Sequence, residues 1–402
     1  MVKGTSLSKN FSVVFKTLRD HPGMAFNLTT SFLEKIKAEQ IDYRRSSGKT
    51  NSLSLLYMRI TPLCNLHCLT CGQRGVKGVL KGDYAIEEAK KIVPLEDYKR
   101  FIDEVSVKRP VFYIWGGEPF MYPHIMEVAR HIVERGCVMS INTNGTLLTR
   151  HAEQIVRDRW SAIFVSLDSF EEENDKIRGK GSYRKVMEGL EALKREKEKQ
   201  GTELPHVGIV TVASRLNYLH LAKLVDAMGD KGLSWHIINL GTYTNDRIIA
   251  RQRVFMKENL DTDIYALEGF NSGFNEGIDG EKFQEILKSI HSMNNRYPII
   301  TVPVIRPKKI GEYYGNLETV VRDTCRAPWS QADIDYNGNV HFCADYPEYV
   351  IGNIREQPFF EIFNSERARK FRRVLKSTPR GLFPGCVRCY QNMLFGKRCR
   401  GY

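Results

Sequence analysis

The segment that decides the fold reads Ile60-Thr-Pro-Leu-Cys64-Asn-Leu-His-Cys68-Leu-Thr-Cys71-Gly72 and follows an apolar run at residues 53–60. Its cysteines have the spacing C-x3-C-x2-C, so one loop carries three thiolates that can bind one metal centre. A cubane [4Fe-4S] cluster needs a ligand on each of four irons, so three local cysteines leave one iron for an outside ligand. The alternatives are a zinc site or three clustered buried cysteines. The three-residue gap fits the paired C-x2-C pattern of zinc sites poorly.

A second motif follows within residues 111–119, where a β-branched and aromatic run ends in Gly116-Gly117-Glu118-Pro119. Two glycines let the backbone approach a ligand closely, and a carboxylate there can pair with an ammonium group. Together the two motifs resemble the radical S-adenosylmethionine (SAM) superfamily. That resemblance implies that the open iron binds SAM and that Gly116 to Pro119 receive its amino group. It also implies reductive cleavage of SAM to a 5′-deoxyadenosyl radical, which removes a hydrogen atom from an unactivated C–H bond.

Composition narrows the class of protein. The chain has 402 residues, enough for two or more domains, and its net charge is +13. No helix-turn-helix, RNA-binding signature or zinc finger appears, so no nucleic-acid partner is expected. No run of eighteen apolar residues and no signal peptide is present. Nine cysteines, mostly in metal-like spacings, indicate a reducing cytoplasm.

Residues 1–52 contain two short amphipathic patterns, at 11–18 and 24–36, separated by His21-Pro22-Gly23. Proline and glycine break helices, so two helices are expected here. We interpret the segment as a helical extension packed on the main domain. The alternative is peripheral attachment to a membrane, or access to a lipid substrate.

Residues 53–245 alternate between strand-like and helical patterns, which is typical of right-handed βαβ units and a parallel sheet. Six repeats match the partial (β/α)6 TIM-like barrel that the resemblance implies, with active-site residues at the C-terminal ends of strands. A connector at 246–320 holds a helical stretch, 280–293, and an apolar strand, 299–304. The predicted barrel strands are 53–60, 111–115, 137–142, 161–166, 207–212 and 233–238, and the predicted helices are 95–105, 124–134, 153–158, 182–200 and 218–228.

The resemblance also implies further SAM contacts at strand ends. Asn142 matches a polar contact, Ser166 and Asp168 match an S-[IL]-D motif, and Arg178 is placed to neutralise the carboxylate of SAM. Asn144 reads as a turn residue before Gly145. Many relatives place an aromatic residue before the third cysteine, where this chain has Thr70, so adenine must stack elsewhere. Candidate substrate-facing residues are Trp235, His236 and Asn239, and each also suits a buried core position.

Residues 321–402 form a second candidate metal region. Asn337-Gly338 is a strong hairpin turn signal within residues 332–342, and it brings Cys325 and Cys343 together. This region resembles the small SPASM/twitch domain of radical SAM enzymes, which contains a β-hairpin and helices. The resemblance implies one auxiliary [4Fe-4S] cluster, and a four-cysteine zinc site is the alternative. The expected ligands are Cys325, Cys343, Cys386 and Cys389, with Cys399 as a spare thiol.

The expected function is therefore that of a cytoplasmic radical SAM oxidoreductase. We expect it to oxidise or epimerise a small or conjugated metabolite, with electrons from a donor such as flavodoxin or ferredoxin. The auxiliary cluster would accept the electron left on the substrate, and His341, Asp345 or Tyr346 would act as the base. The alternatives are a maturase that cross-links a ribosomal peptide and a non-catalytic iron–sulfur protein.

Overall fold

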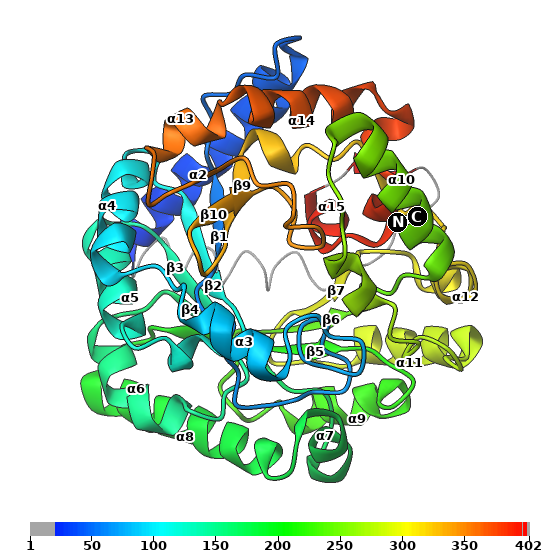
Figure 1. Ribbon diagram of the computed structural model, residues 1–402. Coiled ribbons are helices and arrows are strands. Elements are labelled where there is room, and N and C mark those ends of the chain that lie inside the picture. The colour runs from blue at the N-terminus through cyan, green and yellow to red at the C-terminus, as the bar shows by residue number, and fades with distance from the viewer. Residues whose placement is uncertain (1–20, 396, 400–402) are drawn as a thin grey trace.

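The computed structural model describes residues 21–395 and 397–399 (Figure 1). Its main sheet has ten strands in the order β11-β10-β9-β1-β2-β3-β4-β5-β6-β7. Strands β1 to β7 are parallel, β9 pairs in parallel with the other edge of β1, and β10 and β11 are antiparallel. The strands are β1 Leu55–Arg59, β2 Val111–Trp115, β3 Met139–Thr143, β4 Ala162–Ser166, β5 His206–Val212, β6 Trp235–Asn239, β7 Ile299–Val302, β8 Arg322–Asp323, β9 Gln331–Ile334, β10 Asn339–His341, β11 Gly352–Asn353 and β12 Lys397–Arg398.

Helices surround the curved sheet, and α3 crosses the front of the view in Figure 1. The N-terminal helix is α2, Pro22–Gln40. Pro22 lies in the first turn of this helix, where a residue has no intrahelical use for its N–H group. The other predicted helical pattern, at 11–18, lies outside the described residues. The other helices are α3 Gly82–Ala89, α4 Leu95–Val105, α5 Ile125–Glu134, α6 Leu148–Arg157, α7 Glu171–Arg178, α8 Ser182–Gln200, α9 Leu221–Ala227, α10 Asp246–Leu260, α11 Gly280–Ser292, α12 Ile310–Gly315, α13 Phe359–Phe363, α14 Glu366–Ser377 and α15 Tyr390–Phe395.

Burial alternates along the barrel strands, so that a fully buried core under the helices is separated from a more open lumen. In β2, Phe112 and Ile114 are fully buried, whereas Tyr113 and Trp115 are only half-buried. Strand β6 repeats the pattern, with half-buried residues at every second position. Side chains on one face of the sheet therefore pack under the helices, while those on the other line a lumen with room for ligands.

The C-terminal region joins the barrel sheet directly. The predicted hairpin forms β9 and β10, with Gly338 at φ +90° in the turn, and β9 lies beside β1. At the opposite edge, the strand predicted in the connector is β7, which pairs in parallel with β6. Helix α15 contacts β7, and Gln391 at its start donates to Asp333 of β9, so α15 bridges the two sides. Among the described residues, no helix is long and apolar enough to cross a membrane.

Candidate functional site

The cysteine loop after β1 is packed against the glycine pair after β2. The amide of Gly117 donates to Thr61 O at 2.9 Å, and that of Glu118 donates to Leu63 O at 2.7 Å. A Cβ atom on Gly117 would lie 2.0 Å from Leu63 O, and one on Gly116 would lie 2.7 Å from Thr61 O. These glycines therefore let the two motifs share one backbone interface, a close approach that side chains would prevent.

The three sulfurs of this loop lie in surroundings that suit thiolate ligands. The amide of Leu66 lies 3.4 Å from Cys64 Sγ, and the amides of Gln73 and Arg74 each lie 3.4 Å from Cys71 Sγ. Burial raises the pKa of Cys64 to about 12. Ionisation of such a thiol requires a cation, which metal coordination supplies.

Cys68 faces the end of α7. Burial raises its pKa to about 11, although the nearby Arg178 guanidinium favours the thiolate. Arg178 is only 11% exposed and forms an ion pair with Asp168 at 2.8 Å. The backbone is tied here too, since Leu69 N donates to Ile177 O at 2.8 Å. Arg178 is thus a buried cation beside the cysteine loop, at the end of α7.

Glu118 is fully buried and links the ends of β2 and β3. Its carboxylate accepts hydrogen bonds from Thr143 Oγ1 and the Asn144 amide, both at 2.7 Å, and from the Phe120 amide at 3.2 Å. Burial raises the pKa of Glu118 to about 7 despite these donors. The carboxylate therefore fixes the loop after β3, and its expected contact with an ammonium group stays a prediction.

Buried polar groups that have no hydrogen-bond partner among the described residues lie along the lumen. Asn142 lies on the lumen face of β3, and its buried Oδ1 has no hydrogen-bond partner in the described structure. The Trp115 Nε1 group on β2 is likewise buried and unpaired there. Ser166 ends β4 and is 9% exposed. Since buried polar groups are normally hydrogen-bonded, unpaired ones fit a site that a cofactor or substrate completes.

A belt of aromatic rings crosses the lumen. Ring centroids lie 5.6 Å apart for Tyr57 and Tyr113, 5.5 Å for Tyr113 and Phe164, and 5.1 Å for Phe164 and Trp235. The Trp235 indole lies over Gly208, where a Cβ would come 2.0 Å from its Nε1. The belt offers surfaces on which flat groups can stack. This chain has Thr70 before its third cysteine, where many relatives have an aromatic residue, so the belt is the alternative place for stacking.

The three candidate substrate residues of β6 divide between the two faces. Trp235 and Asn239 lie on the lumen face, whereas His236 is fully buried on the other face. Its Nε2 lies 2.8 Å from Thr211 Oγ1, and burial lowers its pKa to about 3. His236 is therefore a core residue.

Sequence reasoning missed two residues. Asn144 is more than a turn residue: its Nδ2 donates to Asn65 Oδ1 at 2.8 Å and lies 3.8 Å from Cys64 Sγ.

The second residue, Asp333, is buried on β9 beside Tyr57. Its Oδ2 accepts a hydrogen bond from Gln391 Nε2 at 2.7 Å, and its Oδ1 is unpaired among the described groups. Burial raises the pKa of Asp333 to about 8. Alternation in Ala332-Asp333-Ile334-Asp335 was the available signal, since it places both acids on one face.

The four C-terminal cysteines expected as ligands are all buried and close enough to influence one another's ionisation. Burial, the Asp345 carboxylate and the other three cysteines raise the pKa of Cys389 well above its ordinary value. Tyr346 Oη lies 3.1 Å from Cys386 Sγ, and the Asp345 carboxylate hydrogen-bonds with Cys389. Burial raises the pKa of Asp345 to about 6. Two of the three candidate bases thus contact these cysteines directly.

Cys399 lies apart from this set. Its Sγ is 3.7 Å from Asp323 Oδ2, and its amide donates to Val321 O, beside the short β8–β12 pair. In the described residues, no three His, Cys, Asp or Glu side chains converge to hold a single metal ion.

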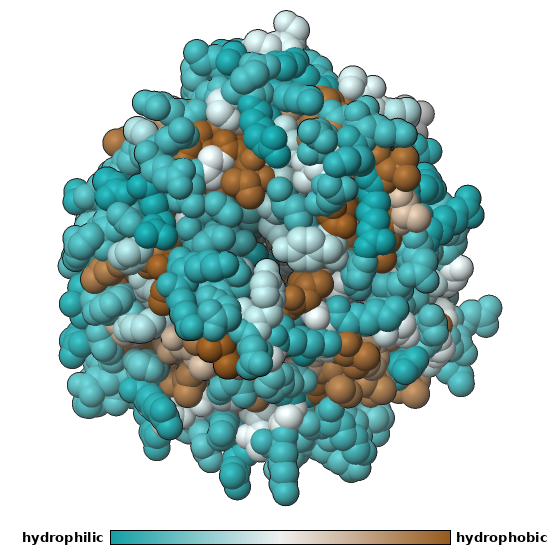
Figure 2. Space-filling view, in the orientation of Figure 1, coloured by the Kyte–Doolittle hydropathy of each residue, from teal (hydrophilic) through white to brown (hydrophobic). Residues whose placement is uncertain are grey.

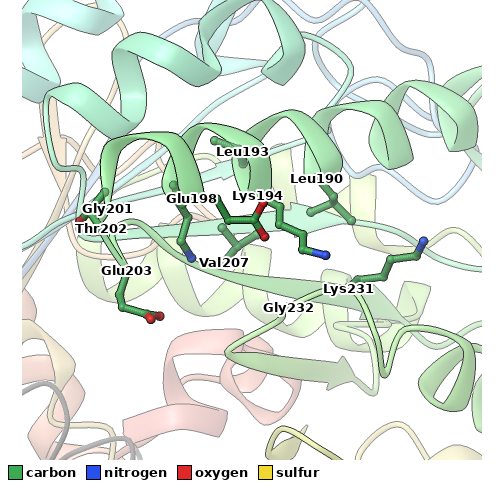
Figure 3. Close-up of a pocket in the computed structure, with 11 residues that line it drawn as sticks. Leu190, Leu193, Lys194, Glu198, Gly201, Thr202, Glu203, Val207, Lys231 and Gly232 are labelled. Atoms are coloured by element: carbon green, nitrogen blue, oxygen red, sulfur yellow. The ribbon is translucent and has the colours of Figure 1, made fainter.

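Cavities lie at both ends of the barrel. One of about 240 Å³ adjoins the cysteine-loop end and is lined by residues that include Arg59, Tyr84 and Asp335. Figure 2 shows this side of the molecule, where mainly hydrophilic side chains surround a central hollow. Another of about 390 Å³ lies between α8 and the N-terminal end of β5, beside Lys194 and Val207 (Figure 3). The second cavity is therefore remote from the candidate site.

Comparison with known families gives two matches. Residues 58–209 match the radical SAM superfamily, and residues 325–390 match the SPASM iron–sulfur cluster-binding domain. The chain is 26% identical over 372 residues to an AdoMet-dependent heme synthase of Methanosarcina barkeri, covering 88% of this chain and 93% of that protein. It is also 26% identical to a serine-type anaerobic sulfatase-maturating enzyme of Bacteroides thetaiotaomicron, covering 79% and 76%.

Solved structures share the fold. SuiB of Streptococcus suis bound to its precursor peptide SuiA has a TM-score of 0.56 at 14% identity, covering 88% of this chain and 73% of that one. The anSMEcpe protein with bound AdoMet has a TM-score of 0.52 at 18% identity, covering 79% and 82%. Both likenesses concern the architecture alone.

Proposed function

Since the chain is a radical SAM superfamily enzyme with a C-terminal SPASM iron–sulfur domain, we propose that it oxidises or epimerises a small or conjugated metabolite held in the barrel lumen. The observation that carries the proposal is the assembly around the cysteine loop. The glycine pair, the Asp168–Arg178 ion pair and the unpaired Asn142 oxygen all border one end of the lumen.

We assign Cys64, Cys68 and Cys71 as the cluster ligands, which leaves one iron for the amino-acid end of SAM. The carbonyls and amides around Gly116 and Gly117 then offer hydrogen bonds to the amino group. When bound, SAM and the cluster would supply a 5′-deoxyadenosyl radical able to remove a hydrogen atom from the substrate. Arg178, which pairs with Asp168, would supply positive charge for the SAM carboxylate, and Asn142 and Ser166 would hold its ribose and adenine.

The lumen residues would orient the substrate and receive its proton. Oxidation at carbon removes a second electron and a proton after the hydrogen atom has left. We assign the electron to one auxiliary cluster held by Cys325, Cys343, Cys386 and Cys389. Asp333 replaces His341, Asp345 and Tyr346 as our candidate base, because it lies beside Tyr57 of the aromatic belt and has one unpaired carboxylate oxygen among the described groups. Its other oxygen accepts a hydrogen bond from Gln391, two residues after Cys389.

The heme synthase similarity spans nearly the full chain and favours a conjugated, ring-containing metabolite that the aromatic belt could stack. The second candidate is peptide maturation. It is favoured by the fold shared with SuiB bound to a precursor peptide and with anSMEcpe bound to a peptide. Asp333 and the belt would serve either substrate.

The test is anaerobic reconstitution followed by dithionite reduction in the presence of SAM. We expect about eight irons per chain, four for each cubane, and formation of 5′-deoxyadenosine. Cys71→Ser should abolish deoxyadenosine formation, whereas the matched control Cys399→Ser should retain it. Zinc in place of iron at the cysteine loop, or equal loss in both variants, would overturn the proposal.

A further inference from the structure

The outward face of α2 carries large apolar side chains where a surface helix ordinarily carries polar ones. Phe26, Phe32 and Leu33 are 60%, 59% and 59% exposed, and Leu28 and Ile36 are each 40% exposed. Leu28, Phe32 and Ile36 follow at four-residue steps, and Phe26 and Leu33 are seven residues apart. These spacings place all five on one side of the helix, which we call the α2 apolar stripe.

The inner face of α2 is small and polar, and its contacts fix the rotation of the helix. Asn27 Nδ2 donates to Arg109 O at 3.1 Å and Gly136 O at 3.3 Å, and Asn27 Oδ1 accepts from the Val138 amide at 3.2 Å. Ser31 Oγ donates to Ser54 O at 2.7 Å. Because these bonds are satisfied only in this rotation, the apolar stripe faces outward as a property of the fold.

Positive charge borders the stripe. Helix α2 is itself balanced, since its lysines Lys35 and Lys37 pair with Glu39 and Glu34. The segment that follows adds exposed Arg44, Arg45 and Lys49, of which Arg45 pairs with the buried Asp42 at 3.3 Å. Basic helix α14 docks on that segment through Lys376 Nζ, which donates to the Tyr43 carbonyl at 2.8 Å.

Apolar residues flanked by cations match the interface of a bilayer that contains anionic lipid. There the rings and aliphatic groups enter the headgroup boundary while lysine and arginine contact phosphates. A net charge of +13 adds long-range attraction to such a surface. A protein partner would satisfy the stripe but gives no reason for the adjoining cations.

We propose that α2 is an interfacial helix that seats this enzyme on membranes containing anionic lipid. The hydrogen bonds of Asn27 and Ser31 place the helix at the N-terminal ends of β1, β2 and β3. The cysteine loop lies at the opposite ends of these strands, so docking leaves the lumen entrance facing away from the bilayer. This orientation suits a substrate that arrives from solution.

The test is flotation of the full-length holoenzyme with vesicles of phosphatidylcholine, alone or mixed with phosphatidylglycerol. We expect the wild type to float with the mixed vesicles only. The Phe32→Ser/Leu33→Ser double variant should bind at least about tenfold more weakly, because it removes two large apolar side chains from the contact. Val254→Ser is the matched control, since Val254 is 56% exposed on α10, and it should bind like the wild type.

Three results would overturn the proposal. The first is wild-type protein that stays at the bottom of the gradient with mixed vesicles. The second is equal flotation of wild type and double variant. The third is a wild-type dimer in solution that the double variant converts to a monomer without lipid, which would assign the stripe to a second copy. The melting temperature of the double variant should equal that of the wild type, because both side chains are exposed.

Discussion

At the scale of single residues, Gly117 joins the two motifs that carry the chemistry. Gly117→Ala would place a methyl group 2.0 Å from Leu63 O, so the cysteine loop would have to move. We expect a loss of about 1–3 kcal/mol in the free energy of unfolding and a lower iron content after reconstitution. Chemical denaturation and iron analysis measure the two effects.

Gly311→Ala is the matched control, because nothing lies within 4 Å of its added Cβ in helix α12. It should be neutral, or stabilising by about 0.5–1 kcal/mol. Wild-type stability and iron content in Gly117→Ala would show that the loop tolerates displacement.

The raised pKa of Asp333 predicts that the free energy of unfolding depends on pH. Its pKa is about 8 in the folded protein, against about 3.9 in an unfolded chain. Because the folded-state pKa is the higher one, its stabilising contribution is complete below about pH 4 and is lost as the pH rises to about 8. Asp333→Asn keeps the shape of the side chain and removes its ionisable group. Urea denaturation of the apo-protein should therefore show the variant gaining on the wild type between about pH 5 and 8, and parallel curves would contradict this.

The residues that the sequence could identify are those with local spacing. Cys64, Cys68 and Cys71 are recognisable because one loop holds them all. Asn144 and Asp333 are different, because their roles come from contacts with Asn65 and Gln391 that lie far away along the chain. Such pairings arise from tertiary packing, which no local pattern records.

At the scale of elements, β1 to β6 follow the predicted strands closely, since each is a short apolar or aromatic run between helical patterns. Helix α6 begins at Leu148, five residues before the predicted start. Leu148 is fully buried and extends the apolar face formed by Ala152 and Ile155. The first amphipathic pattern, at 11–18, lies outside the described residues, and the second forms α2.

Helix α2 supplies a prediction at this scale. Asn27→Ala removes three hydrogen bonds and leaves the buried Val138 amide, at the start of β3, without its acceptor. We expect a loss of about 1–3 kcal/mol in the free energy of unfolding, measured by chemical denaturation. Thr30→Ala is the control, since its hydroxyl donates only to Phe26 O within the same helix. Equal effects of the two variants would mean that Asn27 does not anchor α2.

At the scale of the whole molecule, the C-terminal region completes the barrel instead of standing beside it. In β9, Ala332 and Ile334 are fully buried, and the strand covers one edge of β1. The hairpin turn was predictable from Asn337-Gly338, but its parallel pairing with β1 was not. That register depends on a strand almost three hundred residues earlier in the chain.

A chain ending at residue 320 should therefore fail to fold. It would expose the edge of β1. It would also remove Ser330, whose carbonyl accepts a hydrogen bond at 2.7 Å from the amide of Ser54, the residue that Ser31 of α2 contacts. We expect the truncated chain to collect in the insoluble fraction, measured against full-length protein expressed in parallel. A soluble, cooperatively melting fragment would show that residues 1–320 fold without the C-terminal region.

The β1–β9 pairing also bears on how electrons travel. The cysteine loop leaves the end of β1, and Cys343 lies just beyond the hairpin that starts with β9, so one ladder of backbone hydrogen bonds connects the two iron–sulfur regions. The distance between the two proposed clusters would consequently be set by a sheet and not by a hinge. Electron transfer across it would proceed without waiting for any closure of domains, and its rate should be insensitive to solvent viscosity.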